Sequence, residues 1–264
     1  MHWGSEPDLV GPRHYFRVAL MARALARYLP PSGRREAAKA AEPIPRVLDA
    51  GAGRGTLARR LAGQGYRVVA VEESASFVQY LRVRRPRGTQ PGLAVVRGDV
   101  AALPFGAARF DGIVCGEVLE HVADDAAALA ELARALRPGG VLVATVPAGR
   151  GRYGWLDRWA GHVRRYDRSD LARRAAGAGL VVRELHHWGF PFGLLYERLV
   201  QRPVLAHHAR AGAAPGLARR VGRAPVVARG LGLLFDLDRA CDALPWGPGL
   251  LLVAQRPLSA DNAD

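Results

Sequence analysis

The fold of this chain is decided by residues 47–56, which read Val47-Leu48-Asp49-Ala50-Gly51-Ala52-Gly53-Arg54-Gly55-Thr56. An apolar run enters a turn with glycine at every second position, and a helical pattern follows. Glycine lets the backbone approach a ligand closely, and a helix N-terminus offers unpaired N–H groups. Seventeen residues after Gly55, Glu72 ends the next apolar run, where a carboxylate can hold both hydroxyls of a ribose. The combination predicts a site for a nucleoside-containing cofactor.

Apolar segments alternate with helical patterns on both sides of this turn. The expected strands cover residues 46–50, 67–71, 93–97, 110–115 and 141–146, and the expected helices cover 55–62, 74–85 and 123–136. Strands without polar alternation that are separated by helices are typical of a parallel sheet covered on both faces. We therefore predict a doubly wound α/β fold with a mostly parallel sheet.

The flanking regions are predicted to complete one structural domain. An amphipathic helix is expected over residues 13–29 and a linker over 34–45. Later elements are a helix capped by Ser169 or Asp170, a strand over 180–185 and a last strand over 250–254. The chain then divides into an N-terminal cap (1–45), a cofactor-binding core (46–148) and a C-terminal elaboration that binds the acceptor and completes the sheet (149–264).

Composition excludes several classes of protein. The 264 residues include two cysteines, too few for a disulfide framework, and no apolar run reaches the roughly 20 residues of a membrane span. The first ten residues do not resemble a signal peptide, so a cytoplasmic location is expected. The formal charge of +14 suggests nucleic acid, but residues 149–264 carry +8 of it and the core is nearly balanced. A nucleic-acid partner is therefore disfavoured.

The glycine spacing separates two classes of cofactor. Counted from Gly51, the third glycine of the dinucleotide pattern G-x-G-x-x-G would fall on Thr56, and counted from Gly53 it would fall on Ala58. The spacing G-x-G-x-G, with Asp49 in front, instead resembles motif I of the class I S-adenosylmethionine-dependent methyltransferases.

Three further motifs extend the resemblance to the type 11 family of these enzymes over about residues 46–147. They are Gly98-Asp99-Val100, the segment 110–122 that contains Cys115-Gly116-Glu117 and Leu119-Glu120-His121-Val122, and Leu136-Arg137-Pro138-Gly139-Gly140. The resemblance implies the Rossmann-like fold with a seven-stranded sheet, an N-terminal helix and a C-terminal helical elaboration. It also implies S-adenosyl-L-methionine as cofactor.

The resemblance also assigns roles to residues that match the family motifs. The methionine part of the cofactor would lie against Asp49, Gly51, Gly53 and Gly55, with the carbonyl of Gly116 as a further acceptor for its ammonium. Glu72 would bind the ribose, and Asp99 with Val100 would bind the adenine.

Two histidines are candidates for catalysis, because transfer to a hydroxyl requires removal of a proton. His121 follows the fourth strand, and His162 lies in Gly161-His162-Val163-Arg164-Arg165-Tyr166, a string that resembles one in type 11 relatives. His162, Arg165 and Tyr166 are expected to line the acceptor pocket, although either histidine could be structural and the string could be a surface loop. No pair of histidines shows metal-ligand spacing, so no metal site is predicted.

The acceptor is expected to be a small molecule, with oxygen slightly favoured over nitrogen or carbon. Aromatic residues between 188 and 235 and the acid-free stretch 201–235 suit an apolar acceptor or peripheral contact with a membrane, although packed helices with solvated arginines are the alternative. Two other functions stay open: a methyltransferase-like binding protein without turnover, and a nicotinamide-dependent oxidoreductase. The sequence leaves the oligomeric state open.

Overall fold

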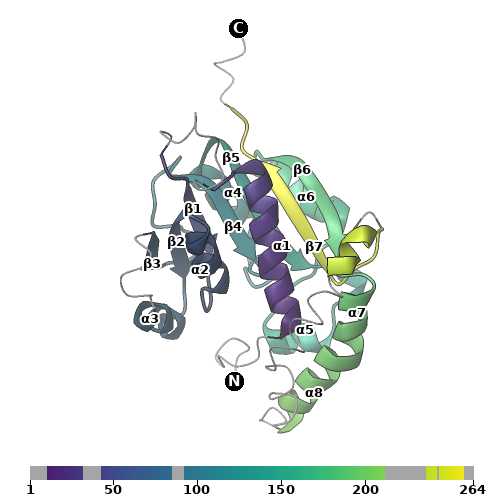
Figure 1. The fold of residues 1–264 in the computed structure, drawn as a ribbon. Coiled ribbons are helices and arrows are strands. Elements are labelled where there is room, and N and C mark those ends of the chain that lie inside the picture. Colours follow the sequence, from purple (N-terminus) through teal and green to yellow (C-terminus); the bar gives the residue numbers. More distant parts are fainter. Residues whose placement is uncertain (1–10, 32–42, 85–91, 212–235, 243, 259–264) are drawn as a thin grey trace.

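The computed structural model describes residues 11–31, 43–84, 92–211, 236–242 and 244–258, and a seven-stranded sheet forms its centre (Figure 1). The strand order is β3-β2-β1-β4-β5-β7-β6. The strands are β1 (Arg46–Ala50), β2 (Arg67–Glu72), β3 (Leu93–Arg97), β4 (Phe110–Gly116), β5 (Leu136–Pro147), β6 (Val181–Trp188) and β7 (Gly249–Gln255). β1 to β5 are parallel, and β7 runs antiparallel to both β5 and β6. The predicted doubly wound, mostly parallel sheet is confirmed.

Helices cover the sheet and extend beyond it. They are α1 (Pro12–Tyr28), α2 (Thr56–Gly63), α3 (Ala75–Val83), α4 (Asp125–Ala135), α5 (Trp155–Ala160), α6 (Arg168–Gly177), α7 (Phe192–Tyr196) and α8 (Arg202–Ala211), with a π-helical turn over Glu197–Gln201. Short 3₁₀ turns cover Arg150–Arg152 and Asp238–Cys241. In the part of the chain that the structure describes, no helix combines the length and apolar character that a bilayer span requires.

The core has two halves, one on each face of the sheet. Successive strand residues point to opposite faces, so Val47 packs with the side of α1 and α2, and Leu48 packs with the side of α4 and α6. Leu61 of α2 and Leu129 of α4 are both fully buried on their respective faces. Burial of β1 on both faces is the reason that its adjacent residues Val47 and Leu48 are both apolar.

Helix α1 lies along the sheet in Figure 1 and reaches the carboxyl ends of β4 and β5. A Cβ atom on Gly112 would lie 3.0 Å from Leu25 Cδ1, and one on Gly116 would lie 3.0 Å from Met21 Sδ. These glycines of β4 therefore leave the space that α1 occupies. At its N-terminal end α1 also joins the C-terminal region, because Arg13 pairs with the buried Glu197 at 3.1 Å.

The predicted boundaries differ from the structure in a few places. The helix expected to be capped by Ser169 or Asp170 begins at Arg168, after Asp167. Asp170 instead lies in the first turn, where its carboxylate pairs with Arg174 at 3.2 Å. α5 was not predicted. The linker expected over 34–45 lies mostly outside the described residues, as do residues 212–235 of the acid-free stretch.

Candidate active site

The glycine turn that follows β1 is closely packed against neighbouring loops. Gly51 has a φ of +73°, and a Cβ atom there would lie 2.4 Å from Val118 Cγ2. The amide N–H groups of Gly51 and Ala52 both donate to the carbonyl of Val71, at 2.9 and 2.8 Å. The turn therefore folds over the end of β2 and contacts the loop that follows β4. These contacts bring the predicted cofactor turn beside the loop that carries His121.

Glu72 holds the turn in place at the end of β2. Its Oε2 accepts from the amide of Gly53 at 2.8 Å, and its Oε1 accepts from the amide of Ser74 at 2.9 Å. A carboxylate has about four lone-pair sites, so each oxygen can accept one further hydrogen bond. The carboxylate thus has the acceptor capacity that two ribose hydroxyls require.

Asp49 is a buried carboxylate at the end of β1, with 3 % of its surface exposed. Its Oδ2 has no hydrogen-bond partner among the described residues. Burial raises the pKa of Asp49 to about 7; the charge of Glu72 adds to this shift, whereas the amide of Ala58 and the charge of Arg17 oppose it. An unpartnered buried carboxylate oxygen is costly in the unliganded protein, and it fits the ammonium group of an amino-acid ligand. The residues present therefore fit the cofactor's methionine part.

We expect binding of S-adenosylhomocysteine to depend on pH through Asp49. Below about pH 7 the carboxyl is neutral and cannot pair with an ammonium group, so affinity should rise with pH between about 6 and 8 and binding at pH 6 should release a proton. Calorimetry in buffers of different ionisation enthalpy measures both quantities. Asp49→Asn should lower the affinity at pH 8 by about tenfold or more and abolish its pH dependence; an unchanged affinity would contradict the assignment.

In the unliganded protein, the ionisation of Asp49 lowers the stability of the fold as the pH rises, whereas it raises the affinity for the ligand. The folded pKa of Asp49, about 7, lies above its unfolded value of 3.8, so the folded state binds more protons between these values. This contribution to stability is present at low pH and is lost as the pH rises through 7. Asp49→Asn should therefore stabilise the unliganded protein at pH 8, which urea unfolding measures.

The remaining predicted cofactor residues lie at the same edge of the sheet. Asp99 follows β3, is exposed, and accepts from the amide of Ala101 through Oδ1 at 2.8 Å, and Val100 beside it is buried. Gly116 ends β4 beneath Met21, and Gly55 precedes α2 with a φ of +68°. Because β1 to β4 are parallel, their carboxyl ends bring these residues to one side of the molecule. Their roles toward a cofactor stay predictions.

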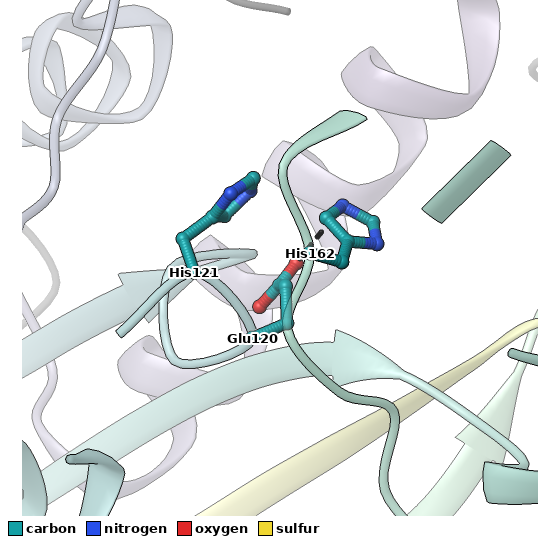
Figure 2. A group of neighbouring side chains, drawn as sticks. All are labelled: Glu120, His121 and His162. Carbon is teal, nitrogen blue, oxygen red and sulfur yellow. Dashed lines mark ion pairs between the residues drawn. The ribbon is translucent and has the colours of Figure 1, made fainter. Parts of the chain in front are cut away.

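The two candidate histidines lie against each other. Their ring centroids are 4.7 Å apart and the rings are nearly perpendicular. His121 Nδ1 lies 3.2 Å from the carbonyl of Gly161, and His162 Nδ1 lies 3.0 Å from Asp157 Oδ1. Figure 2 shows Glu120 near both rings, with its Oε1 4.0 Å from His162 Nε2. Partial desolvation and the neighbouring His162 lower the pKa of His121.

Asp157 is a functional candidate that sequence reasoning missed. It is 1 % exposed, and its oxygens accept from Arg165 Nε at 2.7 Å and from the amide of Gly154 at 2.9 Å. Burial alone would raise its pKa, but the bonds from His162, Arg165 and Gly154 hold it at about 2. Asp157 is therefore ionised at neutral pH, and His162 must donate from Nδ1. Neutral His162 then carries its free lone pair on Nε2.

The two other residues of the predicted acceptor pocket have different positions. Arg165 is 8 % exposed. Its guanidinium group donates to Asp157 through Nε and to the carbonyl of Ala148 at 3.3 Å. Tyr166 is fully buried; its hydroxyl donates to Asp125 Oδ2 at 2.7 Å, and the carbonyl oxygen of Leu119 lies 3.1 Å away as an alternative acceptor. The expectation that Tyr166 lines the pocket is corrected, because its ring belongs to the core and its hydroxyl is occupied. Arg165 positions Asp157 rather than forming an exposed wall.

Known proteins resemble the core of this chain in sequence. Residues 48–144 match the profile of a methyltransferase domain, that of the type 11 family. Demethylmenaquinone methyltransferase of Beutenbergia cavernae is 41 % identical over 103 residues, which are 39 % of this chain and 41 % of that protein. Ubiquinone biosynthesis O-methyltransferase of Xylella fastidiosa is 39 % identical over 100 residues, 37 % of this chain and 39 % of that protein. The matches thus span about two fifths of these relatives.

Solved structures resemble the whole fold at low sequence identity. Haemonchus contortus phosphoethanolamine N-methyltransferase 2, in complex with S-adenosyl-L-methionine, has a TM-score of 0.64 and 18 % identity, covering 97 % of this chain and 55 % of that chain. The [4+2]-cyclase SpnF has a TM-score of 0.59 and 21 % identity, covering 97 % and 86 %. The fold alone therefore accommodates more than one reaction. The sequence matches, and not the fold, identify residues 48–144 as a methyltransferase domain similar to the type 11 family of S-adenosylmethionine-dependent methyltransferases.

Proposed function

We propose that this protein transfers a methyl group from S-adenosyl-L-methionine to a small-molecule acceptor, and that the acceptor atom is an oxygen. One observation carries the proposal: the cofactor turn contacts the loop after β4 through Gly51 and Val118, and that loop leads directly to the His121–His162 pair. A donor site and a group suited to proton transfer therefore share one edge of the sheet. The family of the core supports methyl transfer over nicotinamide chemistry.

The cofactor would be held by residues whose chemistry fits its parts. Asp49 supplies an unpartnered carboxylate oxygen for the ammonium group, and Glu72 supplies spare acceptor sites for the ribose. Asp99 and Val100 offer an acceptor and an apolar surface for the adenine. When bound, S-adenosyl-L-methionine supplies an electrophilic methyl group, which is released as the sulfonium becomes a neutral thioether.

The protein must then align the acceptor and receive its proton. Asp157 holds His162 through Nδ1, which leaves Nε2 directed toward the Glu120 side of the cluster. His162 Nε2 can orient an acceptor hydroxyl or accept its proton, and the His121 ring lies beside it as a second polar group. Fixed orientation and a positioned proton acceptor are the two contributions that a transfer of this kind requires from the chain.

An apolar, quinol-type hydroxyl compound is the acceptor class that the relatives support. One of them is named a demethylmenaquinone methyltransferase and another a ubiquinone biosynthesis O-methyltransferase. In this chain, the exposed apolar side chains Leu195, Leu199 and Val200 lie on α7 and the π-helical turn, beside Arg198 and Arg202. An apolar surface next to arginines suits peripheral contact with an anionic membrane, which we include in the proposal.

Turnover of quinol-type acceptors at saturating cofactor tests the two histidines. We expect His162→Ala to lower kcat by about 100-fold or more, because the acceptor loses its positioned polar partner. Asp157→Asn should lower kcat in the same direction, since it removes the anion that selects the His162 tautomer, and His121→Ala should have a smaller effect. Calorimetry with S-adenosylhomocysteine should show unchanged cofactor affinity in all three variants. If neither histidine variant lowers kcat, both proposed roles are wrong.

A further inference from the structure

Glu120, His121 and His162 bring three potential metal ligands together on two loops. One ligand atom of each residue lies within 4.8 Å of the others (Figure 2). The loops meet because β4 and β5 are neighbours in the sheet and because the amide of Val163 donates to the carbonyl of Glu120 at 2.8 Å. The backbone therefore holds the three residues in register, although His121 and His162 are far apart in the sequence.

In both imidazoles the hydrogen bond uses Nδ1 and leaves Nε2 free. Nδ1 of His162 lies 3.0 Å from the carboxyl oxygen Oδ1 of Asp157, and Nδ1 of His121 lies 3.2 Å from the carbonyl oxygen of Gly161. Each partner is an acceptor, so each neutral ring carries its proton on Nδ1 and its lone pair on Nε2. Histidines that bind metals are oriented in this way, with the second ring nitrogen donating to a carboxylate or a backbone carbonyl.

Glu120 supplies the carboxyl member of the group. It is fully buried, and neither of its carboxylate oxygens has a hydrogen-bond partner among the described residues. His162 Nε2 lies 4.0 Å from Glu120 Oε1, which is too long for a hydrogen bond. A buried carboxyl group without a partner is unfavourable. Because it lies beside two free imidazole nitrogens, a cation bound by all three groups would provide that partner.

We infer that Glu120, His121 and His162 bind a divalent transition-metal ion of the Zn²⁺ class. Two imidazoles and one carboxylate are a donor set of catalytic zinc sites, which keep an open position, whereas Mg²⁺ and Ca²⁺ prefer oxygen ligands. Ligands at about 2.0–2.2 Å from a tetrahedral ion lie roughly 3.5 Å apart, so small side-chain rotations close the site. The spacing of these residues along the chain does not indicate the site, since the ligands come from separate loops.

The open position would face the proposed methyl acceptor, so this inference rests on the proposed function. An ion held there binds an oxygen of the acceptor and favours loss of its proton to solvent. With the ion bound, the histidines orient the acceptor through the ion; His162 then takes the orienting role of the two proposed for it, because its Nε2 is a ligand and the proton leaves to solvent. Asp157 becomes the residue that holds a ligand imidazole in position.

Metal titration of the full chain, stripped with a chelator that is then removed, tests the site. We expect calorimetry to show one Zn²⁺ per chain, and Co²⁺ to give visible absorption of a four- or five-coordinate ion. Glu120→Gln and His162→Ala should each weaken Co²⁺ binding by about 100-fold or more, and Asp157→Asn by about 10- to 100-fold. His186→Ala is the matched control, since that imidazole lies near Asp242 outside the cluster, and it should bind Co²⁺ as the unchanged protein does.

Three results would overturn the metal site: absence of stoichiometric Zn²⁺ and Co²⁺ binding, unchanged affinity in Glu120→Gln, or displacement of Co²⁺ by equal concentrations of Mg²⁺. The first is measured on the unchanged protein and does not depend on the folding of any variant. S-adenosylhomocysteine binding to the stripped protein separates this inference from the proposed function. If the nucleoside binds and the metals do not, only the metal site is wrong; if the reverse holds, the proposed function is wrong.

Discussion

Glu72→Ala is expected to weaken S-adenosylhomocysteine binding by about 100-fold or more. Hydrogen bonds to a charged acceptor contribute about 1.5–3 kcal/mol each, so loss of two ribose contacts removes at least about 3 kcal/mol. The variant also removes the acceptor for the amide of Gly53 at 2.8 Å, which holds the glycine turn. Calorimetry measures the affinity, and circular dichroism checks that the fold is retained.

The adjacent Glu73 provides a matched control. Glu73 is exposed, and the hydrogen bond from Arg97 reaches its backbone carbonyl rather than its side chain. Glu73→Ala should therefore leave the affinity unchanged, while Glu72→Gln, which keeps one oxygen acceptor, should lie between the two alanine variants. Equal affinities for Glu72→Ala and the unchanged protein would refute the ribose assignment.

Asp125→Ala is expected to lower the free energy of unfolding by about 3 kcal/mol, because it removes one side of a buried ion-pair network. Asp125 is 2 % exposed and pairs through Oδ1 with Arg164 at 2.7 Å and with Arg174, while Oδ2 accepts from Tyr166. In this variant the Tyr166 hydroxyl can still donate to the carbonyl of Leu119, and Arg164 and Arg174 can still contact water. Both effects limit the loss of stability. Urea unfolding measures the change.

Asp124 is the matched control for this variant. Its side chain accepts from the amide of Ala127 at 2.9 Å and caps α4. Asp124→Ala should cost about 1 kcal/mol, as loss of a helix cap does. If the two variants cost the same, the Asp125 network does not stabilise the fold beyond a helix cap, and the buried role of Tyr166 loses its explanation.

Local pattern determined much of the core in advance. β1 and β3 have the predicted bounds, and β2 and β4 each extend one residue further. These strands are buried on both faces or flanked by helices, so their apolar runs carry a clear signal. α5 carries none, because its six residues lie between Gly154 and Gly161 and are too few to show a period of 3.6.

Side-chain partners were less predictable than elements. Tyr166 was expected at the acceptor, yet Asp125, 41 positions earlier, draws its hydroxyl into the core. Asp157 was not singled out, because an acid five residues before a histidine is common in sequences. Only the fold of α5 and the following loop brings the side chains of Asp157 and His162 into contact. Such pairs depend on which loops meet, and loops meet according to strand order.

The sequence by itself determined the parallel sheet and the glycine turn after β1 and predicted the cofactor class, since each follows from residues near one another in the chain. Only the tertiary structure decided that Asp157 orients His162, that Tyr166 is buried, and that Glu120 lies unpartnered beside two imidazoles. The physical reason is the neighbouring position of β4 and β5: their carboxyl ends bring together loops whose residues have no regular spacing in sequence.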